Sequence, residues 1–355
     1  MKPDIISRYI HFHFSRYPYS QLQDLCKLLF QQTFGPKHLI QNGTKSLASL
    51  QIEVQQARTS SHFYDPIGNG LARIHLGNLP TDSSLSALNH ATFLAAATVF
   101  GTPDDLKRAL SVLKISCKNG TLPFSPLDAE QFCSAWETDG FPPLHHSMLY
   151  RQRYTPAYRV VPVEYPRYFP MFHAIEHQLA KQGFCVLAID GDSGAGKTTL
   201  ARLLQQIYPC AVVHMDDFFL PVSQKTKVRL QTPGSNVDWE RFLSELSTSL
   251  QKRKPISYRR FDCKRQMLEA PVSLPIAPLI VVEGAYSHRP ELRHLYDFTV
   301  FLSLSASSQR KRISIRNPAL FPQFLQEWIP LEKAYQAAYS IPANSTFSFS
   351  SEDEL

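Results

Sequence analysis

The residues FCVLAIDGDSGAGKTT, numbered 184–199, join a short apolar run to a glycine-rich turn. Phe184–Asp190 is an apolar run of strand length, as expected for a β-strand covered on both faces of a parallel sheet. The next residues match the pattern G-x-x-x-x-G-K-[ST], which forms a phosphate-binding loop when it lies between a strand and a helix. This stretch therefore predicts an α/β domain that binds a nucleotide.

The residue types of this loop suit a polyphosphate. Its glycines let backbone N–H groups turn inward around the β-phosphate, and the N-terminus of the following helix adds its dipole. We expect Lys197 to reach the β- and γ-phosphates and the Thr198 hydroxyl to ligate Mg²⁺. The residues expected to bind ATP are Gly191, Asp192, Ser193, Gly194, Ala195, Gly196, Lys197, Thr198 and Thr199.

Further apolar runs after the loop indicate how the sheet continues. A helix beginning at Lys197 should end before Pro209, and strands are predicted at Ala211–Met215, Leu279–Val282 and Phe298–Leu304. Alternating strands and helices imply a doubly wound parallel sheet of the P-loop NTPase type, with right-handed crossovers. In such sheets, ligands bind beyond the carboxyl ends of the strands.

Two acidic residues, Asp216 and Asp217, follow the second predicted strand. Right-handed crossovers bring that strand end to the same edge of the sheet as the phosphate loop. A carboxylate there can accept a proton from an attacking hydroxyl, and its neighbour can help order Mg²⁺ through water. The structural alternative is that the pair caps a following helix. The base-reading string N-K-x-D of switch GTPases is absent from the sequence.

In this order, the motifs resemble the uridine kinase and phosphoribulokinase group of P-loop kinases, over about residues 183–340. The resemblance implies that Asp216 is the general base. It also implies that Glu283, at the end of a predicted strand, is a carboxylate on the metal side. With Thr198 and Asp217, Glu283 completes the residues that we expect around Mg²⁺.

The same resemblance implies residues for the acceptor and for a lid. Asp238, in the segment Asn236–Trp239, would hold the ribose hydroxyls of the acceptor. Arg312 and Arg316 would be lid arginines. Their spacing alone places them on one helix face, where two guanidinium groups can neutralise the transferring phosphoryl group. The alternative is a solvated basic face.

The segment Tyr258–Gln266 resembles the corresponding segment of the family only loosely. The tyrosine and histidine that recognise uracil in uridine kinases would fall near Phe261 and Gln266, and phenylalanine has no hydroxyl. Phe261 and Asp262 join Asp238 as expected acceptor contacts. The arginines and lysines of this segment favour an acceptor that already bears a phosphate or carboxylate. The alternative is that they form a solvated face of a hairpin.

Composition limits the remaining classes of protein. A chain of 355 residues is long enough for two domains, and a hydrophobic content of 43% supports sizeable cores. No apolar run approaches the roughly 20 residues of a membrane helix, and the first residues do not resemble a secretory signal. We therefore expect a cytoplasmic protein with buried thiols. The formal charge of +7 is concentrated over residues 225–265 and 310–316, which suits anionic ligands.

The chain is expected to divide into four segments: a mostly helical domain at 1–140 without a catalytic signature, a linker rich in Pro, Tyr and Arg at 141–180, the kinase domain at 181–342 and a flexible tail at 343–355. The first segment is faintly similar to an uncharacterised region that precedes such kinase domains in bacterial proteins, through Gln32–Leu39 and Ile67–Gly70. Two isolated histidine pairs, His11 with His13 and His145 with His146, favour packing over metal binding.

Together these features favour a Mg²⁺-dependent ATP kinase that phosphorylates a hydroxyl of a nucleoside, a sugar or a phosphorylated metabolite. Lys197, Arg312 and Arg316 would stabilise charge in that reaction. One alternative is a kinase or NTPase acting on nucleic-acid ends, held by the Tyr- and Arg-rich linker. The other is a nucleotide-sensing module whose helical half binds a partner protein. We expect a small-molecule acceptor and no membrane partner.

Overall fold

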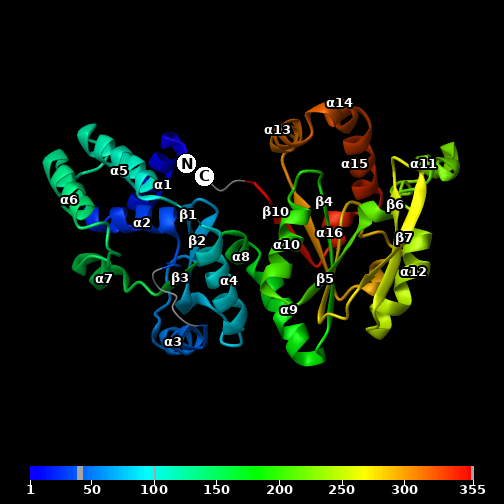
Figure 1. Ribbon diagram of the computed structural model, residues 1–355, viewed down its shortest axis with the longest axis horizontal. Helices are drawn as coiled ribbons and strands as arrows, with labels where there is room; N and C mark the ends of the chain where they lie inside the picture. Colours follow the sequence, from blue (N-terminus) through cyan, green and yellow to red (C-terminus); the bar gives the residue numbers. More distant parts are fainter. Residues whose placement is uncertain (38–42, 100, 353–355) are drawn as a thin grey trace. The chain divides into compact units, whose positions relative to one another are not determined.

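The computed structural model describes residues 1–37, 43–99 and 101–352, which form two compact units. The first unit is Met1–Phe169, and the second begins at Pro170. Figure 1 shows the helices and strands of both. None of the helices in the described residues is both long and apolar enough to cross a bilayer. All six cysteines are free, and four of them are buried: Cys26, Cys117, Cys133 and Cys185.

The first unit is mostly helical, as predicted, and also contains a small antiparallel sheet. Its strands lie in the order β1-β2-β3 and are β1 Tyr64–Gly68, β2 Leu71–His75 and β3 Tyr158–Pro162. Its helices are α1 Pro3–Arg16, α2 Leu22–Phe34, α3 Gly43–Gln56, α4 Leu85–Thr98, α5 Pro103–Lys118, α6 Pro126–Thr138, α7 Met148–Tyr154 and α8 Glu164–Arg167. The turn Gly68–Gly70 joins β1 to β2, and all three of its residues have positive φ.

Helices α1, α2, α5 and α6 enclose one core of this unit. Leu25 and Leu29 of α2 pack with Leu106 and Leu110 of α5, so the apolar residues of each helix recur at the spacing of one helix face. At the start of α5, Thr102 and Asp105 form a capping box, so the acidic residues lie where the helix dipole favours them. Of the motif Gln32–Leu39, His38 and Leu39 lie outside the described residues.

Residues 141–180, expected to be a linker, are instead folded into α7, β3, α8 and most of α9 (Phe169–Gln182). Strand β3 pairs with β2, from Leu71 opposite Pro162 to His75 opposite Tyr158. The prolines do not prevent this, because Pro162 is the last residue of β3 and Pro170 lies in the first turn of α9. Tyr150 is buried, and Arg159 forms an ion pair with Glu53. These two side chains therefore pack within the first unit.

The second unit confirms the predicted α/β fold. Five parallel strands lie in the order β10-β9-β4-β8-β5; they are β4 Cys185–Gly191, β5 Cys210–His214, β8 Leu279–Glu283, β9 Phe298–Ser303 and β10 Phe347–Ser350. Strand β4 is central and entirely buried. Its helices after α9 are α10 Lys197–Ile207, α11 Lys227–Gln231, α12 Trp239–Lys252, α13 Ala306–Arg316, α14 Phe321–Gln323, α15 Ile329–Ala338 and α16 Ile341–Asn344.

The helices of this unit cover both faces of the sheet. Helix α10 packs against β4, β5 and β8. Val186, Val213 and Ile280 of the sheet join Phe242 and Leu246 of α12 in one apolar cluster. A separate hairpin, β6 Ile256–Asp262 with β7 Met267–Leu274, contacts α12 at the edge of the unit (Figure 1).

The expected flexible tail, residues 343–355, is ordered over much of its length. Phe347–Ser350 form β10, which pairs in parallel with Val300–Ser303 of β9. The sequence FSFS alternates apolar and polar residues at the period of a strand, and the Phe347 ring lies 6.1 Å from that of Phe298. The tail prediction was therefore wrong for these residues, and residues 353–355 lie outside the described part of the chain.

Candidate active site

The phosphate loop leaves β4 at Gly191 and enters α10 at Lys197. Gly191 has φ 143°, and a Cβ atom there would lie 2.1 Å from the carbonyl oxygen of Leu302 in the neighbouring strand β9. Only glycine fits this position without displacing β9. Gly194 and Gly196 also have positive φ, Ala195 is buried, and Thr199 is exposed in the first turn of α10.

The side chains of Lys197 and Thr198 project from the start of α10. The Nζ atom of Lys197 donates to the carbonyl oxygens of Gly191, at 2.8 Å, and Asp192, at 3.1 Å. The hydroxyl of Thr198 lies 3.2 Å from one carboxylate oxygen of Glu283 and 3.3 Å from the other. The lysine thus lies over the loop, and the threonine faces the end of β8.

Glu283 links three strand ends of the sheet. It is the last residue of β8, is 6% exposed, and lies opposite His214 of β5 and Ile189 of β4 in the parallel register. Its Oε1 atom is 2.6 Å from Nδ1 of His214. This hydrogen bond raises the pKa of His214 above its usual value, against the effect of burial. A carboxylate and a hydroxyl side by side are oxygen donors of the kind that Mg²⁺ prefers.

Asp216 and Asp217 lie in a short 3₁₀ helix, Met215–Phe218, directly after β5. Asp216 is exposed, but the surrounding protein removes enough water to raise the pKa of its carboxyl, and the charge of Glu283 raises it further. Lys197 acts in the opposite direction on the same pKa. Asp216 is therefore electrostatically coupled to both the phosphate loop and Glu283.

Asp217, expected beside Mg²⁺, turns toward the hairpin instead. Its carboxylate accepts a hydrogen bond of 2.7 Å from the Tyr258 hydroxyl and lies 3.4 Å from Nε of Arg260. These donors on β6 satisfy the charge of Asp217. Of the three residues expected around Mg²⁺, only Thr198 and Glu283 contact each other. No group of three His, Cys, Asp or Glu side chains suited to a metal occurs in the described residues.

Helix α15 holds the phosphate loop through contacts that the sequence analysis missed. Glu332 accepts hydrogen bonds from the backbone N–H and the hydroxyl of Ser193. Lys333 and Gln336 both donate to one carboxylate oxygen of Asp192, at 2.6 and 3.0 Å. The sequence offered only a weak indication of these contacts. Glu332, Lys333 and Gln336 belong to no motif, and their short spacing on one helix is the only feature that they share.

The two expected lid arginines differ in their surroundings. Arg312 of α13 donates to the carbonyl oxygens of Gly194, at 3.4 Å, and Ser351, at 2.7 Å. Arg316 lies one turn further along α13 and is exposed. The helix ends at Arg316, two residues before Pro318. Arg312 therefore lies against the phosphate loop, and Arg316 extends the same helix face into solvent.

The expected acceptor residues lie around α12 and the hairpin. Asp238 caps α12 by accepting the backbone N–H of Arg241, and Phe261 is 8% exposed. Asp262 accepts two backbone N–H groups in the β6–β7 turn. Desolvation and then the charges of Asp216 and Asp262 raise the pKa of Cys263, opposed by Lys225, so the hairpin turn comes within electrostatic reach of Asp216.

The basic residues of the hairpin are partly neutralised by carboxylates. Arg259 pairs with Glu245, Arg260 with Asp217, and Arg265 with Asp262. These ion pairs support the view that a solvated hairpin face accounts for much of the charge there.

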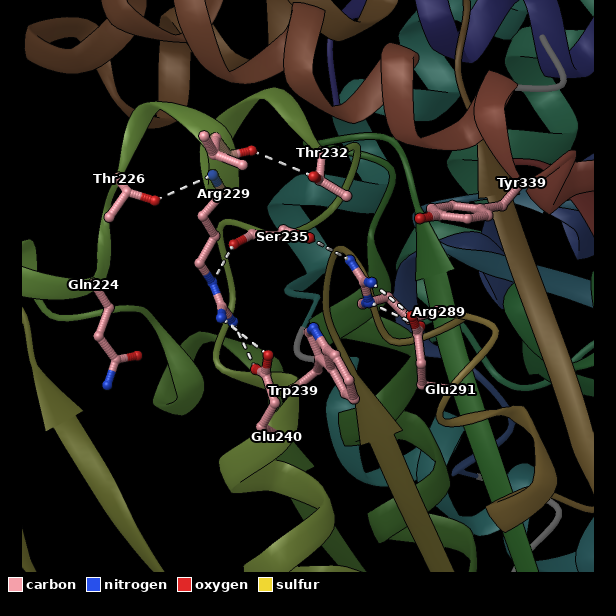
Figure 2. Close-up of a pocket in the computed structure, with 11 residues that line it drawn as sticks. Gln224, Thr226, Arg229, Thr232, Ser235, Trp239, Glu240, Arg289, Glu291 and Tyr339 are labelled. Carbon is pink, nitrogen blue, oxygen red and sulfur yellow. Dashed lines mark hydrogen bonds and ion pairs between the residues drawn. The ribbon is translucent and has the colours of Figure 1, made fainter.

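A pocket of about 590 Å³ lies elsewhere in the second unit, between α11, the start of α12 and Tyr339 (Figure 2). None of the residues expected in the active site lines it. Its two arginines face carboxylates: Arg229 pairs with Glu240 at 2.6 Å, and Arg289 pairs with Glu291 at 2.9 Å. This pocket therefore offers no unpaired guanidinium group to an anion.

Comparison with known proteins finds that part of the chain is similar to curated kinases. No family model matches the chain. Over 120 residues it is 29% identical to uridine-cytidine kinase C of Dictyostelium discoideum, and over 124 residues it is 27% identical to uridine-cytidine kinase D of the same organism. Each match covers 33% of this chain, and 26% and 23% of the two relatives. The chain thus spans about a quarter of the length of these relatives.

A solved structure named "Possible Uridine Kinase from Bacillus stearothermophilus" aligns with 51% of this chain and 99% of its own, at 22% identity and a TM-score of 0.38. The matches to curated kinases agree with the parallel sheet and the phosphate loop described above. The chain therefore contains a uridine kinase-like P-loop kinase domain, which sequence similarity detects over about a third of its length.

Proposed function

We propose that this protein is a kinase that transfers the γ-phosphoryl group of ATP to a hydroxyl of a small metabolite. The main support is the position of Glu283, whose carboxylate contacts Thr198 at the start of α10 and His214 at the end of β5. It thereby joins the phosphate loop to the segment that carries Asp216. A group that binds phosphates and a group that can accept a proton lie on one edge of the sheet.

The loop residues 191–199 would cradle the β- and γ-phosphates of ATP with their backbone N–H groups. Lys197 would exchange its contacts with the loop carbonyls for the phosphate oxygens. Arg312, already beside Gly194, and Arg316 would offset negative charge on the transferring group.

Thr198 and Glu283 fit a magnesium ion because both offer oxygen atoms at one point of the site. When bound, Mg²⁺ would supply positive charge beside the β- and γ-phosphates. Asp217 has a different role in this proposal: its hydrogen bond from Tyr258 anchors the hairpin to the segment that carries Asp216.

Asp216 is proposed as the general base. The acceptor hydroxyl would give its proton to the Asp216 carboxylate, and its oxygen would form a bond to the γ-phosphorus. The bond from that phosphorus to the β,γ-bridging oxygen would break, and ADP would leave with the electron pair. A raised pKa suits this role, because it makes the carboxylate a stronger base.

We propose an acceptor in the class of nucleosides, sugars or phosphorylated metabolites, bound between Asp238, Phe261 and the hairpin. Uridine and cytidine belong in this class because the relatives are named for them. Phe261 offers no hydrogen-bonding group to a uracil ring, and Asp238 already caps α12, so the panel of acceptors extends beyond these two nucleosides.

The test is a panel of hydroxyl compounds incubated with ATP, Mg²⁺ and the full-length protein, with phosphorylated products detected by mass spectrometry. At least one compound should gain a phosphoryl group. Lys197→Ala should abolish product formation while leaving the fold intact. ADP formation without any phosphorylated product would favour the nucleotide-sensing alternative.

A further inference from the structure

The first unit contains a cluster of buried polar side chains to which the proposed kinase reaction gives no role. Asp65, Arg73, His75 and Tyr158 share one face of the β1–β2–β3 sheet, because Asp65 lies opposite Arg73 and His75 opposite Tyr158 in the strand register. Burying charged groups costs free energy unless each is paired. The partners of each charged group therefore show which of them is left unpaired.

The carboxylate of Asp65 is fully paired. It is 1% exposed and receives a hydrogen bond of 2.5 Å from the Tyr17 hydroxyl, another of 2.8 Å from Nε2 of His75, and an ion pair with Arg16. Burial opposes ionisation, but these partners hold the pKa of Asp65 well below its usual value. Asp65 is thus a buried anion whose charge is already balanced.

The second buried carboxylate, Asp24 of α2, is paired as well. It accepts hydrogen bonds from Nδ1 of His146 at 2.8 Å and from the backbone and hydroxyl of Ser147 at 3.0 and 2.6 Å. The other ring nitrogen of His146 lies 2.8 Å from the Tyr158 hydroxyl, which continues the network toward the sheet. Neither Asp24 nor Asp65 forms an ion pair with Arg73.

Arg73 is the group left without a counter-ion. Its side chain is buried, with the residue 3% exposed, and only its Nε atom donates within the cluster, to Gln31 at 2.9 Å. The guanidinium carbon lies 4.8 Å from the centre of the Tyr158 ring. The Nη2 atom of Arg73 has no hydrogen-bond partner in the described residues. A buried guanidinium with an unused donor is costly, and such groups call for a specific explanation.

A second cation lies within electrostatic reach. Burial, followed by the charge of Arg73, lowers the pKa of Lys27 to about 8, opposed by Asp24. Lys27 donates to the carbonyl oxygen of Leu144, which is neutral and leaves the positive charge in place. Burial acts to lower the pKa of Arg73, but the charges of Tyr158, Tyr150 and Asp65 outweigh burial and raise it. The cluster thus keeps two cations close together, with Nη2 of Arg73 unpaired in the described residues.

We propose that this cluster binds a small oxyanion, the phosphate or carboxylate group of a metabolite, through Nη2 of Arg73. Guanidinium groups donate strong charge-assisted hydrogen bonds to both kinds of oxyanion. The ligand would supply both the missing acceptor and the missing negative charge. This site belongs to the first unit and is separate from the phosphate loop, which belongs to the second, so the inference does not depend on the proposed kinase activity.

The test measures amide hydrogen exchange in the full-length protein carrying Lys197→Ala, which weakens phosphate binding at the loop of the second unit. Inorganic phosphate is added in one arm, acetate in a second, and chloride at matched ionic strength in a third. Bound oxyanion should slow exchange in peptides that cover β1 and β2. Protection by phosphate alone assigns a phosphate group, and protection by acetate alone assigns a carboxylate.

The matched variant is Arg73→Met combined with Gln31→Leu, which removes the guanidinium together with the partner of its Nε atom. Replacing both polar partners can be nearly neutral for stability, so the midpoint temperature without added anion should stay the same or rise. The anion-dependent protection should be lost. Arg151→Met, at an exposed position of α7, should keep it.

Two results would overturn the proposal. One is exchange that neither anion slows at millimolar concentration in protein that melts normally, which would mean that water alone satisfies Nη2. The other is protection that survives in the double variant. A lower midpoint temperature for the double variant, with no anion effect in either protein, would assign Arg73 a purely structural role.

Discussion

The carboxylate of Glu332, on α15, accepts hydrogen bonds from both the backbone N–H, at 3.1 Å, and the hydroxyl of Ser193 in the phosphate loop. The two residues are 139 positions apart in the chain. Glu332 is 5% exposed, and burial raises the pKa of its carboxyl, opposed by the charge of Lys197 and the bonds from Ser193. The conformation of the loop is thus stabilised by a helix near the C-terminus of the second unit.

We predict that Glu332→Ala lowers the free energy of unfolding of the second unit by about 2 kcal/mol, because it leaves two partly buried donors of Ser193 without their acceptor. ATP binding should weaken as well. Urea unfolding and an ATP titration measure these two effects. Glu327→Ala, at an exposed position before α15, is the control and should change stability by no more than about 0.5 kcal/mol. Equal effects of the two variants would contradict the role given to Glu332.

Gly191→Ala should destabilise the second unit strongly. The new Cβ atom would lie 2.1 Å from a backbone oxygen of β9, which cannot move without disturbing the sheet. We expect the free energy of unfolding to fall by about 3 kcal/mol or more, which thermal unfolding would show as a lower midpoint temperature. Gly183→Ala is a matched control, because Gly183 also has positive φ but no atom lies within 4 Å of its Cβ position. That variant should lower the free energy of unfolding by only about 1 kcal/mol.

The sequence predicted the centre of the kinase fold because the signals there are local. The apolar run before Gly191 and the pattern G-x-x-x-x-G-K-T each depend on neighbouring residues, and the strands and α10 lie within a few residues of the predicted bounds. The apolar run before Glu283 places this residue at a strand end in the same way, whereas its expected role beside the metal came from the resemblance to the kinase family.

Contacts between distant segments could not be predicted in this way. Glu332 and Lys333 reach the phosphate loop only because α15 packs there, and Asp217 turns to Tyr258 because the hairpin comes close. Strand β2 has the sequence LARIH, and all five residues are buried. Because Arg73 and His75 are polar, the sequence does not show the apolar run expected of a buried strand. The alternation in Phe347–Ser350, by contrast, was a signal that the sequence analysis overlooked.

Thr198→Ala should raise the Mg²⁺ concentration needed for half-maximal turnover by about tenfold or more, because a direct oxygen donor is lost beside Glu283. Thr198→Ser keeps the hydroxyl and should behave nearly as wild type. Initial rates measured across a range of Mg²⁺ concentrations compare the variants, and chelation of Mg²⁺ should stop turnover in all three proteins. An unchanged Mg²⁺ requirement in Thr198→Ala would remove this residue from the metal side.

The stability of the first unit should fall in mild acid because of His13. Burial, and then the charge of Arg73, lowers the pKa of His13 to about 3. Below pH 6.5 the unfolded chain therefore binds a proton that the folded chain does not, and stability present above this pH is lost as the pH falls. The loss between pH 6.5 and pH 4 should be about 3 kcal/mol.

His13→Gln is the variant that tests this pH dependence. It keeps an N–H donor for the carbonyl oxygen of Pro66, to which His13 donates at 2.9 Å, but it cannot titrate. Thermal unfolding between pH 4 and pH 7 should therefore show a shallower decline for the variant than for the wild type. Parallel curves would show that His13 does not contribute to the acid sensitivity.

The most direct measurement is the rate of phosphorylated product formation by wild type, Asp216→Asn and Asp139→Asn, with the best acceptor from the metabolite panel. Asp216→Asn should lower kcat by about 10²–10⁴-fold with ATP binding retained, because the amide cannot accept the proton of the acceptor. Asp139→Asn, at an exposed position at the end of α6, should leave kcat within a few-fold of wild type. Wild-type turnover by Asp216→Asn would contradict the account.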